Sequence, residues 1–129
     1  MADGRTRRKA AEAHGRRAEA LAALWLQLKG YRILARRVRL PVGEIDLVAR
    51  RGKIVAFVEV KARQTREQGE HAVRPEGWRR INRAAESWMA RRPQLAGLDW
   101  RFDLVIVLPR QLPAHLPDRW RPDFAQRHL

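Results

Sequence analysis

The stretch that decides the fold runs from Gly43 to Arg63 and reads GEIDLVARRGKIVAFVEVKAR. Two segments rich in Val and Ile, about residues 44–50 and 54–61, flank the dipeptide Gly52-Lys53. Gly at the first central position of a two-residue turn favours a type II′ β-hairpin. The pattern therefore predicts two antiparallel strands joined by this turn.

The position of the turn also predicts the register of the hairpin. If the strands pair from Gly52-Lys53 onward, Asp46 lies opposite Glu59, and Glu44 lies opposite Lys61. Residues opposite each other in an antiparallel pair point to the same face. A slip of one residue would separate these groups between the two faces. The hairpin is therefore expected to gather four charged side chains on one side of the sheet.

Carboxylates inside an apolar strand need a partner. The residues around Asp46 and Glu59 are apolar at positions that point to both faces: Ile45, Leu47, Val48, Val55, Phe57, Val58 and Val60. Burial removes the hydration of a carboxylate, which is costly unless it is paired or binds a metal. A divalent cation such as Mg²⁺, which accepts one or two carboxylates together with water and phosphate oxygens, would relieve the repulsion. Lys61 leaves the strand on the same side as Glu59. The pattern indicates a metal site beside a lysine; a structural charge cluster at a strand end is the alternative.

Length and charge limit the class of protein. A chain of 129 residues with 45% hydrophobic residues is long enough for one domain with a core. Lys and Arg number 28 against 14 acidic residues, which gives a formal net charge of +14. Such a charge favours a polyanionic partner, with nucleic acid ahead of an anionic membrane.

Disulfides and thiolate metal sites are excluded because the chain contains no cysteine. The most apolar segment near the N-terminus is interrupted by Glu19 and Gln27, so neither a secretory signal nor a membrane span is expected. Both observations favour a cytoplasmic protein.

Segments before the hairpin complete a predicted meander. Residues 7–29 have helical composition, and Leu21, Leu24, Trp25 and Leu28 are expected to form the packed face. Glu19 on this helix is by default a solvated acid. Residues 31–40 are predicted to form a strand that turns at 41–43 into the hairpin, so that three antiparallel strands follow one another.

After the hairpin, residues 63–74 are predicted to be a loop and residues 75–91 a helix. The core face of this helix is expected to contain Trp78, Ile81, Ala85, Trp88 and Met89. Residues 100–109 are predicted to form a buried strand, in which Arg101 and Asp103 make a structural ion pair.

The chain changes character after Pro109, because four prolines between residues 109 and 122 exclude long regular elements. We therefore expect one domain over residues 1–109 and a Pro-rich basic tail over residues 110–129. Trp120 and Phe124 are candidates to anchor this tail.

The sequence GEIDLV followed by FVEVKAR resembles the YraN-like family, a bacterial group placed in the PD-(D/E)XK nuclease superfamily. The likeness includes GRRAEALAALWL, which contains Gly15 and Glu19, as well as GYRILARRVR and RFDLVIV, and covers about residues 12–108. It implies an α/β fold with a restriction-endonuclease-like core, in which a mixed sheet built on an antiparallel β-meander is flanked by two main helices.

The resemblance also implies roles for individual residues. Asp46 and Glu59 correspond to metal ligands, and Lys61 to the catalytic lysine. Glu19 corresponds to the additional helix acid of the Holliday-junction-resolvase branch. The main-chain carbonyl of Val60 is a further candidate ligand, and Glu44 belongs to the GEID pattern as a supporting residue.

One departure concerns the second helix, where family members often carry Lys-Gln and this chain has Gly77-Trp78. Activity therefore follows less directly from the resemblance than the fold does. Arg79 is the residue that could replace the polar pair.

Two functions follow from these observations. The first is a Mg²⁺- or Mn²⁺-dependent endonuclease that acts on DNA and selects structure over sequence. The alternative is a non-catalytic nucleic-acid-binding module that keeps the nuclease fold. Candidate phosphate contacts are Arg36, Arg37, Arg63, Arg79, Arg80 and Arg83. The sequence leaves open DNA or RNA, and monomer or homodimer.

Overall fold

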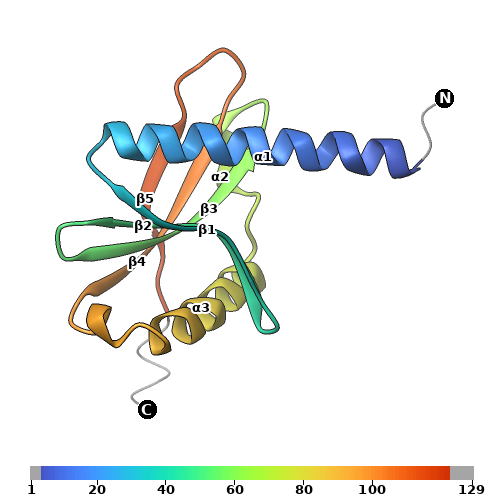
Figure 1. The fold of residues 1–129 in the computed structure, drawn as a ribbon. Coiled ribbons are helices and arrows are strands. Elements are labelled where there is room, and N and C mark those ends of the chain that lie inside the picture. Colours follow the sequence, from blue (N-terminus) through green and yellow to red (C-terminus); the bar gives the residue numbers. More distant parts are fainter. Residues whose placement is uncertain (1–3, 123–129) are drawn as a thin grey trace.

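A five-stranded mixed sheet between two helices forms the body of the protein (Figure 1). The structure is a computed structural model that describes residues 4–122 of the chain. The helical elements are α1 (Gly4–Leu28), α2 (Arg66–Glu70), α3 (Pro75–Ala90) and the 3₁₀ turn η1 (Pro93–Leu95). The strands are β1 (Arg32–Leu40), β2 (Gly43–Arg51), β3 (Ile54–Ala62), β4 (Asp99–Val107) and β5 (Ala114–Trp120). The expected α/β architecture is confirmed.

The strands lie in sequence order across the sheet. β1, β2 and β3 form the expected antiparallel meander. β3 and β4 are parallel, and the connection between them contains α2 and α3. β5 pairs antiparallel with β4.

The face of the sheet that α3 covers holds the larger core. All five residues expected on the core face of α3 are buried, namely Trp78, Ile81, Ala85, Trp88 and Met89. They pack with side chains of the sheet that include Phe57, Phe102 and Leu104. The helical periodicity of this segment therefore predicted its buried face correctly.

The packed face of α1 differs from the expected one. Ala18, Ala22, Ala23 and Leu26 are buried against the sheet, whereas Leu21, Leu24 and Leu28 are 50%, 52% and 72% exposed. The prediction of a leucine face was wrong, because the sheet already supplies large side chains on this side. Opposite Leu47, Val58, Val60 and Val105, small residues let the helix approach closely.

The segment between β3 and α3 was predicted to be a loop and instead contains α2. Thr65 caps this helix: its side chain accepts a hydrogen bond from the main-chain N–H of Gln68, and the Gln68 side chain accepts one from the N–H of Thr65. This is a capping box, whose sequence signature is present in Thr65-Arg66-Glu67-Gln68. Gly69 lets α2 lie against β4, because a Cβ atom there would be 2.5 Å from Ile106.

The prolines after Pro109 were expected to exclude long regular elements, and residues 114–120 form the seven-residue strand β5. β5 joins the sheet at its edge, where one proline, Pro117, is tolerated within a strand. Trp120 does anchor this segment, since its ring is stacked on Trp78 with centroids 6.4 Å apart. Phe124, the second expected anchor, lies outside the described residues.

The hairpin of β2 and β3 has the predicted register. Its pairs run from Arg51↔Ile54 at the turn to Leu47↔Val58. Gly52 has a φ of 59°, while Lys53 keeps a negative φ, as a type II′ turn requires. Beyond Leu47 the pairing of the two strands ends.

Gly43 brings the β1–β2 hairpin against α3. A Cβ atom at this position would lie 2.5 Å from the main-chain oxygen of Arg80. Figure 1 shows this hairpin leading away toward α3 while β3 continues toward α1. The close contact at Gly43 therefore holds β2 away from β3 at their open end.

Within the described residues, no helix has the length and apolar character needed to cross a membrane.

Candidate active site

The acidic residues of the hairpin lie where β2 and β3 separate. Leu47↔Val58 is the last pair of the ladder, so Asp46 and Glu59 are the first residues beyond it. The main-chain N–H of Val60 donates a hydrogen bond to Oδ2 of Asp46 over 2.8 Å. Asp46 therefore replaces the missing strand partner of Val60.

Glu59 contacts both Asp46 and Lys61. Burial, followed by its hydrogen bond to Asp46 and the charge of that residue, raises the pKa of Glu59 to about 9. Lys61 Nζ lies 3.9 Å from Glu59 Oε2. The raised pKa favours the protonated form of Glu59 at neutral pH when no cation is bound.

Glu19 of α1 shares this environment. Burial and the charge of Asp46 raise its pKa, against the opposing charge of Arg37. Nε of Arg37 lies 3.6 Å from Glu19 Oε1, and this oxygen is buried without a hydrogen-bond partner. Glu19 is therefore not the solvated helix acid that its sequence position suggests by default.

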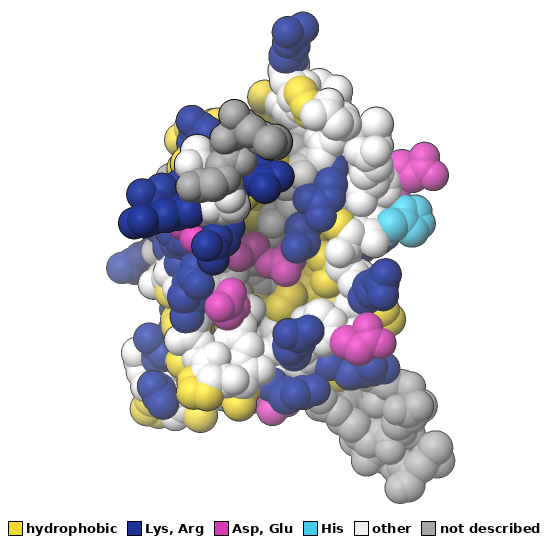
Figure 2. Space-filling view, turned by 90° about the vertical axis from the view of Figure 1, so that its right-hand side faces the viewer, with side chains coloured by type: hydrophobic (Ala, Val, Ile, Leu, Met, Phe, Trp, Pro, Cys, Tyr) yellow, Lys and Arg dark blue, Asp and Glu magenta, His cyan; other side chains and the backbone are white. Residues whose placement is uncertain are grey.

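One cavity of about 400 Å³ is lined by all three acids and by Lys61. α1 contributes Ala11, His14, Gly15 and Ala18 to the same wall. Figure 2 shows acidic side chains in a hollow that Lys and Arg side chains surround. His14 was not a candidate from the sequence, because only the α1–β3 packing brings it to the acids.

The donor set suits a hard divalent cation, since carboxylate oxygens are the ligands that Mg²⁺ prefers. Asp46 and Glu59 are close enough to share a proton, and a cation that displaced this proton could bind both. In residues 4–122, no three His, Cys, Asp or Glu side chains are placed so that together they could hold a metal ion. Glu19 faces Arg37 instead of completing a three-acid set.

The predicted phosphate contacts fall into two groups, all of them exposed. Arg37, Arg63 and Arg80 line the three cavities that border the acids. Arg36, Arg79 and Arg83 line none of these three cavities. The structure thus divides the candidates into a group beside the acids and a group away from them.

Glu44 does not lie opposite Lys61, as we predicted by continuing the β2–β3 register to the end of the strands. It is opposite Arg39 in the β1–β2 ladder, and Nη1 of Arg39 lies 3.5 Å from its Oε1. The reason is that β2 follows β1 after leaving β3 at Leu47. Glu44 nevertheless lines the same cavity as the acids.

Residues 18–107 match a family described as "Uncharacterised protein family UPF0102". The chain belongs to the UPF0102 family. The match covers Glu19, Asp46, Glu59 and Lys61, and it ends at the last residue of β4.

Curated relatives that match this chain over most of their length have the same family name. A UPF0102 protein of Paramagnetospirillum magneticum is 53% identical over 119 residues, which is 89% of this chain and 92% of the relative. One from Parvibaculum lavamentivorans is 54% identical over 108 residues, covering 84% and 81% of the two chains. One from Brucella canis is 51% identical over 117 residues, covering 91% and 93%.

A second polar cluster of this UPF0102 chain is centred on Asp103, which is fully buried. Arg101 donates to both of its carboxylate oxygens over 2.8 and 2.7 Å, and His115 Nε2 lies 2.8 Å from Oδ2. Although burial alone raises the pKa of Asp103, hydrogen bonds from His115 and Arg101 hold it below its usual value. The expected Arg101–Asp103 pair is confirmed. Arg101 also donates to the hydroxyl of Tyr31, and Lys29 contacts His115, so both residues join the cluster.

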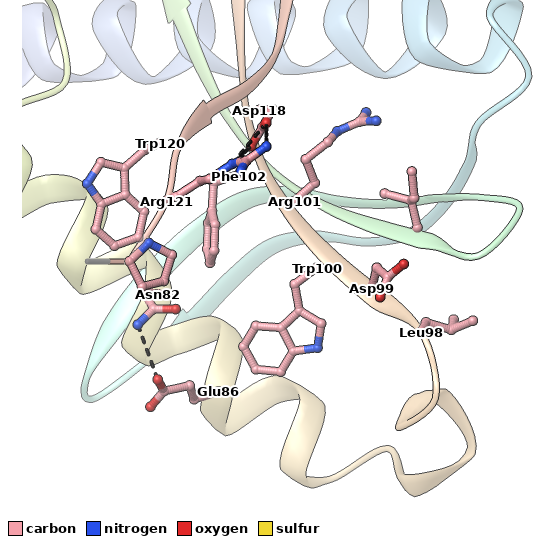
Figure 3. A pocket seen from close by; sticks show the side chains of 12 residues that line it. Asn82, Glu86, Leu98, Asp99, Trp100, Arg101, Phe102, Asp118, Trp120 and Arg121 are labelled. Atoms are coloured by element: carbon pink, nitrogen blue, oxygen red, sulfur yellow. Dashed lines mark hydrogen bonds and ion pairs between the residues drawn. The ribbon is translucent and has the colours of Figure 1, made fainter. Parts of the chain in front are cut away.

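A cavity larger than the one at the acids lies elsewhere, between α3, β4 and β5 (Figure 3). It has a volume of about 640 Å³, and Trp100, Phe102 and Trp120 supply its aromatic walls. Asn82 donates a hydrogen bond to Glu86 on its α3 side, and Arg121 is paired with Asp118 at its β5 side. The cavity contains no lysine, and none of the three acids of the hairpin site lines it.

Proposed function

We propose that this UPF0102 protein is a metal-dependent phosphodiesterase of the PD-(D/E)XK type that acts on nucleic acid. One observation carries the proposal: Asp46, Glu59 and Lys61 meet in one cavity at the point where β2 and β3 separate. A carboxylate pair with an adjacent lysine matches the Asp and Glu-x-Lys pattern on which the resemblance to the YraN-like family rests.

Asp46 and Glu59 are the residues that would hold Mg²⁺ or Mn²⁺, and Glu19 lines the same cavity. When bound, such a cation polarises the scissile phosphate and lowers the pKa of an attacking water. The N–H of Val60 donates to one oxygen of Asp46, so the main chain of β3 fixes the orientation of this carboxylate. Asp46 would therefore offer a cation a ligand of fixed orientation in the cavity that Lys61 also lines.

Lys61 is suited to act on the reacting phosphate. Its side chain is 29% exposed and lies beside Glu59, so it reaches the cavity while still open to a substrate. An ammonium group at this position stabilises negative charge as it develops on the phosphate oxygens. Lys61 also lowers the cost of ionising Glu59, which must lose its proton to bind a cation.

Arg37, Arg63 and Arg80, which line the three cavities that border the acids, support binding to a phosphate backbone together with the net charge of +14. No base-reading motif is present in the sequence, so we expect selection by the shape or branching of DNA over its base sequence.

The alternative function, a binding module without catalysis, is favoured by the hydrogen bond between Asp46 and Glu59. The protonated form of Glu59, which its raised pKa favours, needs no cation. A module of this kind needs the arginines around the cavity and no cation.

The deciding experiment is a cleavage screen with purified protein on linear, flapped and branched DNA and on RNA, in Mg²⁺, Mn²⁺ or EDTA. Wild type is expected to cleave at least one substrate only with a cation. Lys61→Ala is expected to lower the rate about 10²- to 10³-fold, the usual loss for one group that stabilises transition-state charge, while binding changes little. Binding by both proteins without cation-dependent cleavage by either would establish the binding module.

A further inference from the structure

Arg37 has an unusual main-chain conformation in the middle of β1. Its φ is 53°, and among the non-glycine residues of 4–122 only Arg110 and Asp118 also have positive φ. For residues with a Cβ atom this conformation is strained, and it persists only where the surrounding structure enforces it. Arg110 and Asp118 lie after β4, so Arg37 is the one such residue of the meander within the described chain.

The strained residue lies beside the acids. The pairs Arg36↔Leu47 and Val38↔Ile45 flank it, which puts Arg37 opposite Asp46 across the β1–β2 ladder. It lines a small cavity together with Glu19 and Asp46. The strain is therefore located at the candidate active site.

The contact that Arg37 makes there is incomplete. Its Nε lies 3.6 Å from Glu19 Oε1, a distance that gives an ion pair, yet this buried oxygen accepts no hydrogen bond. The guanidinium side chain remains 37% exposed. Arg37 thus acts as an internal counter-cation that is held by charge and has donors left for another partner.

Building on the proposed function, we propose that Arg37 couples the binding of a divalent cation to the binding of the nucleic-acid backbone. In the cation-free protein, Arg37 neutralises Glu19. A cation at the acids takes over this neutralisation, and Arg37, whose side chain is partly exposed, is then released to a phosphate of the bound nucleic acid. The strained conformation at residue 37 keeps the guanidinium beside the acids in both states.

The chain offers a matched control for testing this. Arg37→Gly removes both the guanidinium and the strain, and Arg110→Gly makes the same change at a φ of 57°. Arg110 lines none of the cavities that border the acids. Differences between these two variants therefore report the position of the charge, since the loss of strain and of one positive charge is common to both.

The first measurement is calorimetric titration of each protein with Mg²⁺ in the absence of nucleic acid. Arg37→Gly is expected to bind Mg²⁺ at least about threefold more tightly than Arg110→Gly, because a positive charge has been removed beside the acids. Denaturant unfolding of both variants checks that they fold. The readout does not depend on cleavage.

The second measurement is the salt dependence of DNA binding, with Lys61→Ala added to every protein to suppress cleavage. In EDTA the two Gly variants are expected to have equal slopes of log K against log salt. With Mg²⁺, the slope of Arg37→Gly is expected to be shallower by about 0.9, which corresponds to one lost phosphate contact.

Glu19→Gln tests the pair from the other side, also without a cation. It should strengthen DNA binding in EDTA by releasing Arg37, and this gain should shrink when Arg37→Gly is also present. Wild type that binds Mg²⁺, with equal affinities and slopes for the two Gly variants, overturns the role of Arg37 and leaves the proposed function standing. Wild type that binds no Mg²⁺ overturns both.

Discussion

The main-chain N–H of Val60 donates to Oδ2 of Asp46 over 2.8 Å, so one carboxylate both closes the end of a strand and faces the candidate active site. Asp46→Asn keeps an oxygen that can accept this bond, whereas Asp46→Ala leaves the N–H unpaired. We expect Asp46→Ala to lower the free energy of unfolding by about 1–3 kcal/mol and Asp46→Asn to lower it much less. Both should lose cation-dependent cleavage. Denaturant unfolding separates the two effects, and equal destabilisation by both substitutions would show that the hydrogen bond contributes nothing.

The raised pKa of Glu59 makes stability depend on pH. Because Glu59 binds its proton more tightly in the folded protein, the unfolded chain ionises first as pH rises above its ordinary pKa of 4.5. In EDTA, the contribution of Glu59 is therefore greatest below that pH and is lost progressively as pH rises toward about 9.

Glu59→Gln removes this dependence. The variant should gain stability relative to wild type as pH increases between these limits, and Glu12→Gln, an exposed acid on α1, serves as the control. Thermal unfolding across the pH series measures the difference. A constant difference between Glu59→Gln and wild type at all pH values would contradict the raised pKa.

The two groups of arginines predict different binding. Replacing Arg63 and Arg80 by Ala removes charge beside the acids, whereas replacing Arg79 and Arg83 removes the same charge away from them. The first pair is expected to weaken DNA binding and to reduce the magnitude of the salt slope by up to about two, while the second changes both less. Fluorescence anisotropy at several salt concentrations gives both values. If the two double variants behave alike, binding is diffuse and the rim of the cavity has no special part in it.

The close packing of Gly43 against α3 is expected to affect the position of Asp46 on the same strand. Ala at this residue would bring its Cβ 2.5 Å from the main-chain oxygen of Arg80, which cannot rotate away. We expect Gly43→Ala to cost about 1–3 kcal/mol of stability, as overpacking does, and to lower cleavage because β2 carries Asp46. Gly97→Ala is the control, since a Cβ there meets nothing within 4 Å. Equal unfolding midpoints for the two variants would mean that the hairpin adapts without cost.

The sequence was most informative where structure is local. The register of β2 and β3 follows from the turn at Gly52 and from the alternation of the strands, and both are short-range properties. The separation of β2 from β3 beyond Leu47 could not be read in this way. It depends on β1 and on the contact of Gly43 with α3, so the partner of Glu44 was predicted incorrectly.

Longer-range packing limited the prediction in two further places. The hydrophobicity of Leu21 and Leu28 suggested the wrong face of α1. The large side chains of the sheet leave little space on this side, so the alanine face of the helix is the one that packs. The pairing of Arg101 with Asp103 could be predicted because the two residues are close in sequence. The contact of His115 with Asp103 could not, because it depends on the position of β5 in the sheet. The capping box at Thr65 was visible in the sequence and would have identified α2.

The cluster around Asp103 has a consequence for the order in which the chain folds. Lys29 Nζ and His115 Nδ1 are 2.5 Å apart in space and 86 residues apart in sequence, so their contact closes most of the chain into one loop. Contacts of such large sequence separation form late, because the entropy of closing the loop is lost before the contact is gained. The hairpin that carries Asp46 and Glu59 needs only a two-residue turn. We therefore expect the β2–β3 hairpin to form early, and the contact of β5 with Lys29, just after α1, to form late.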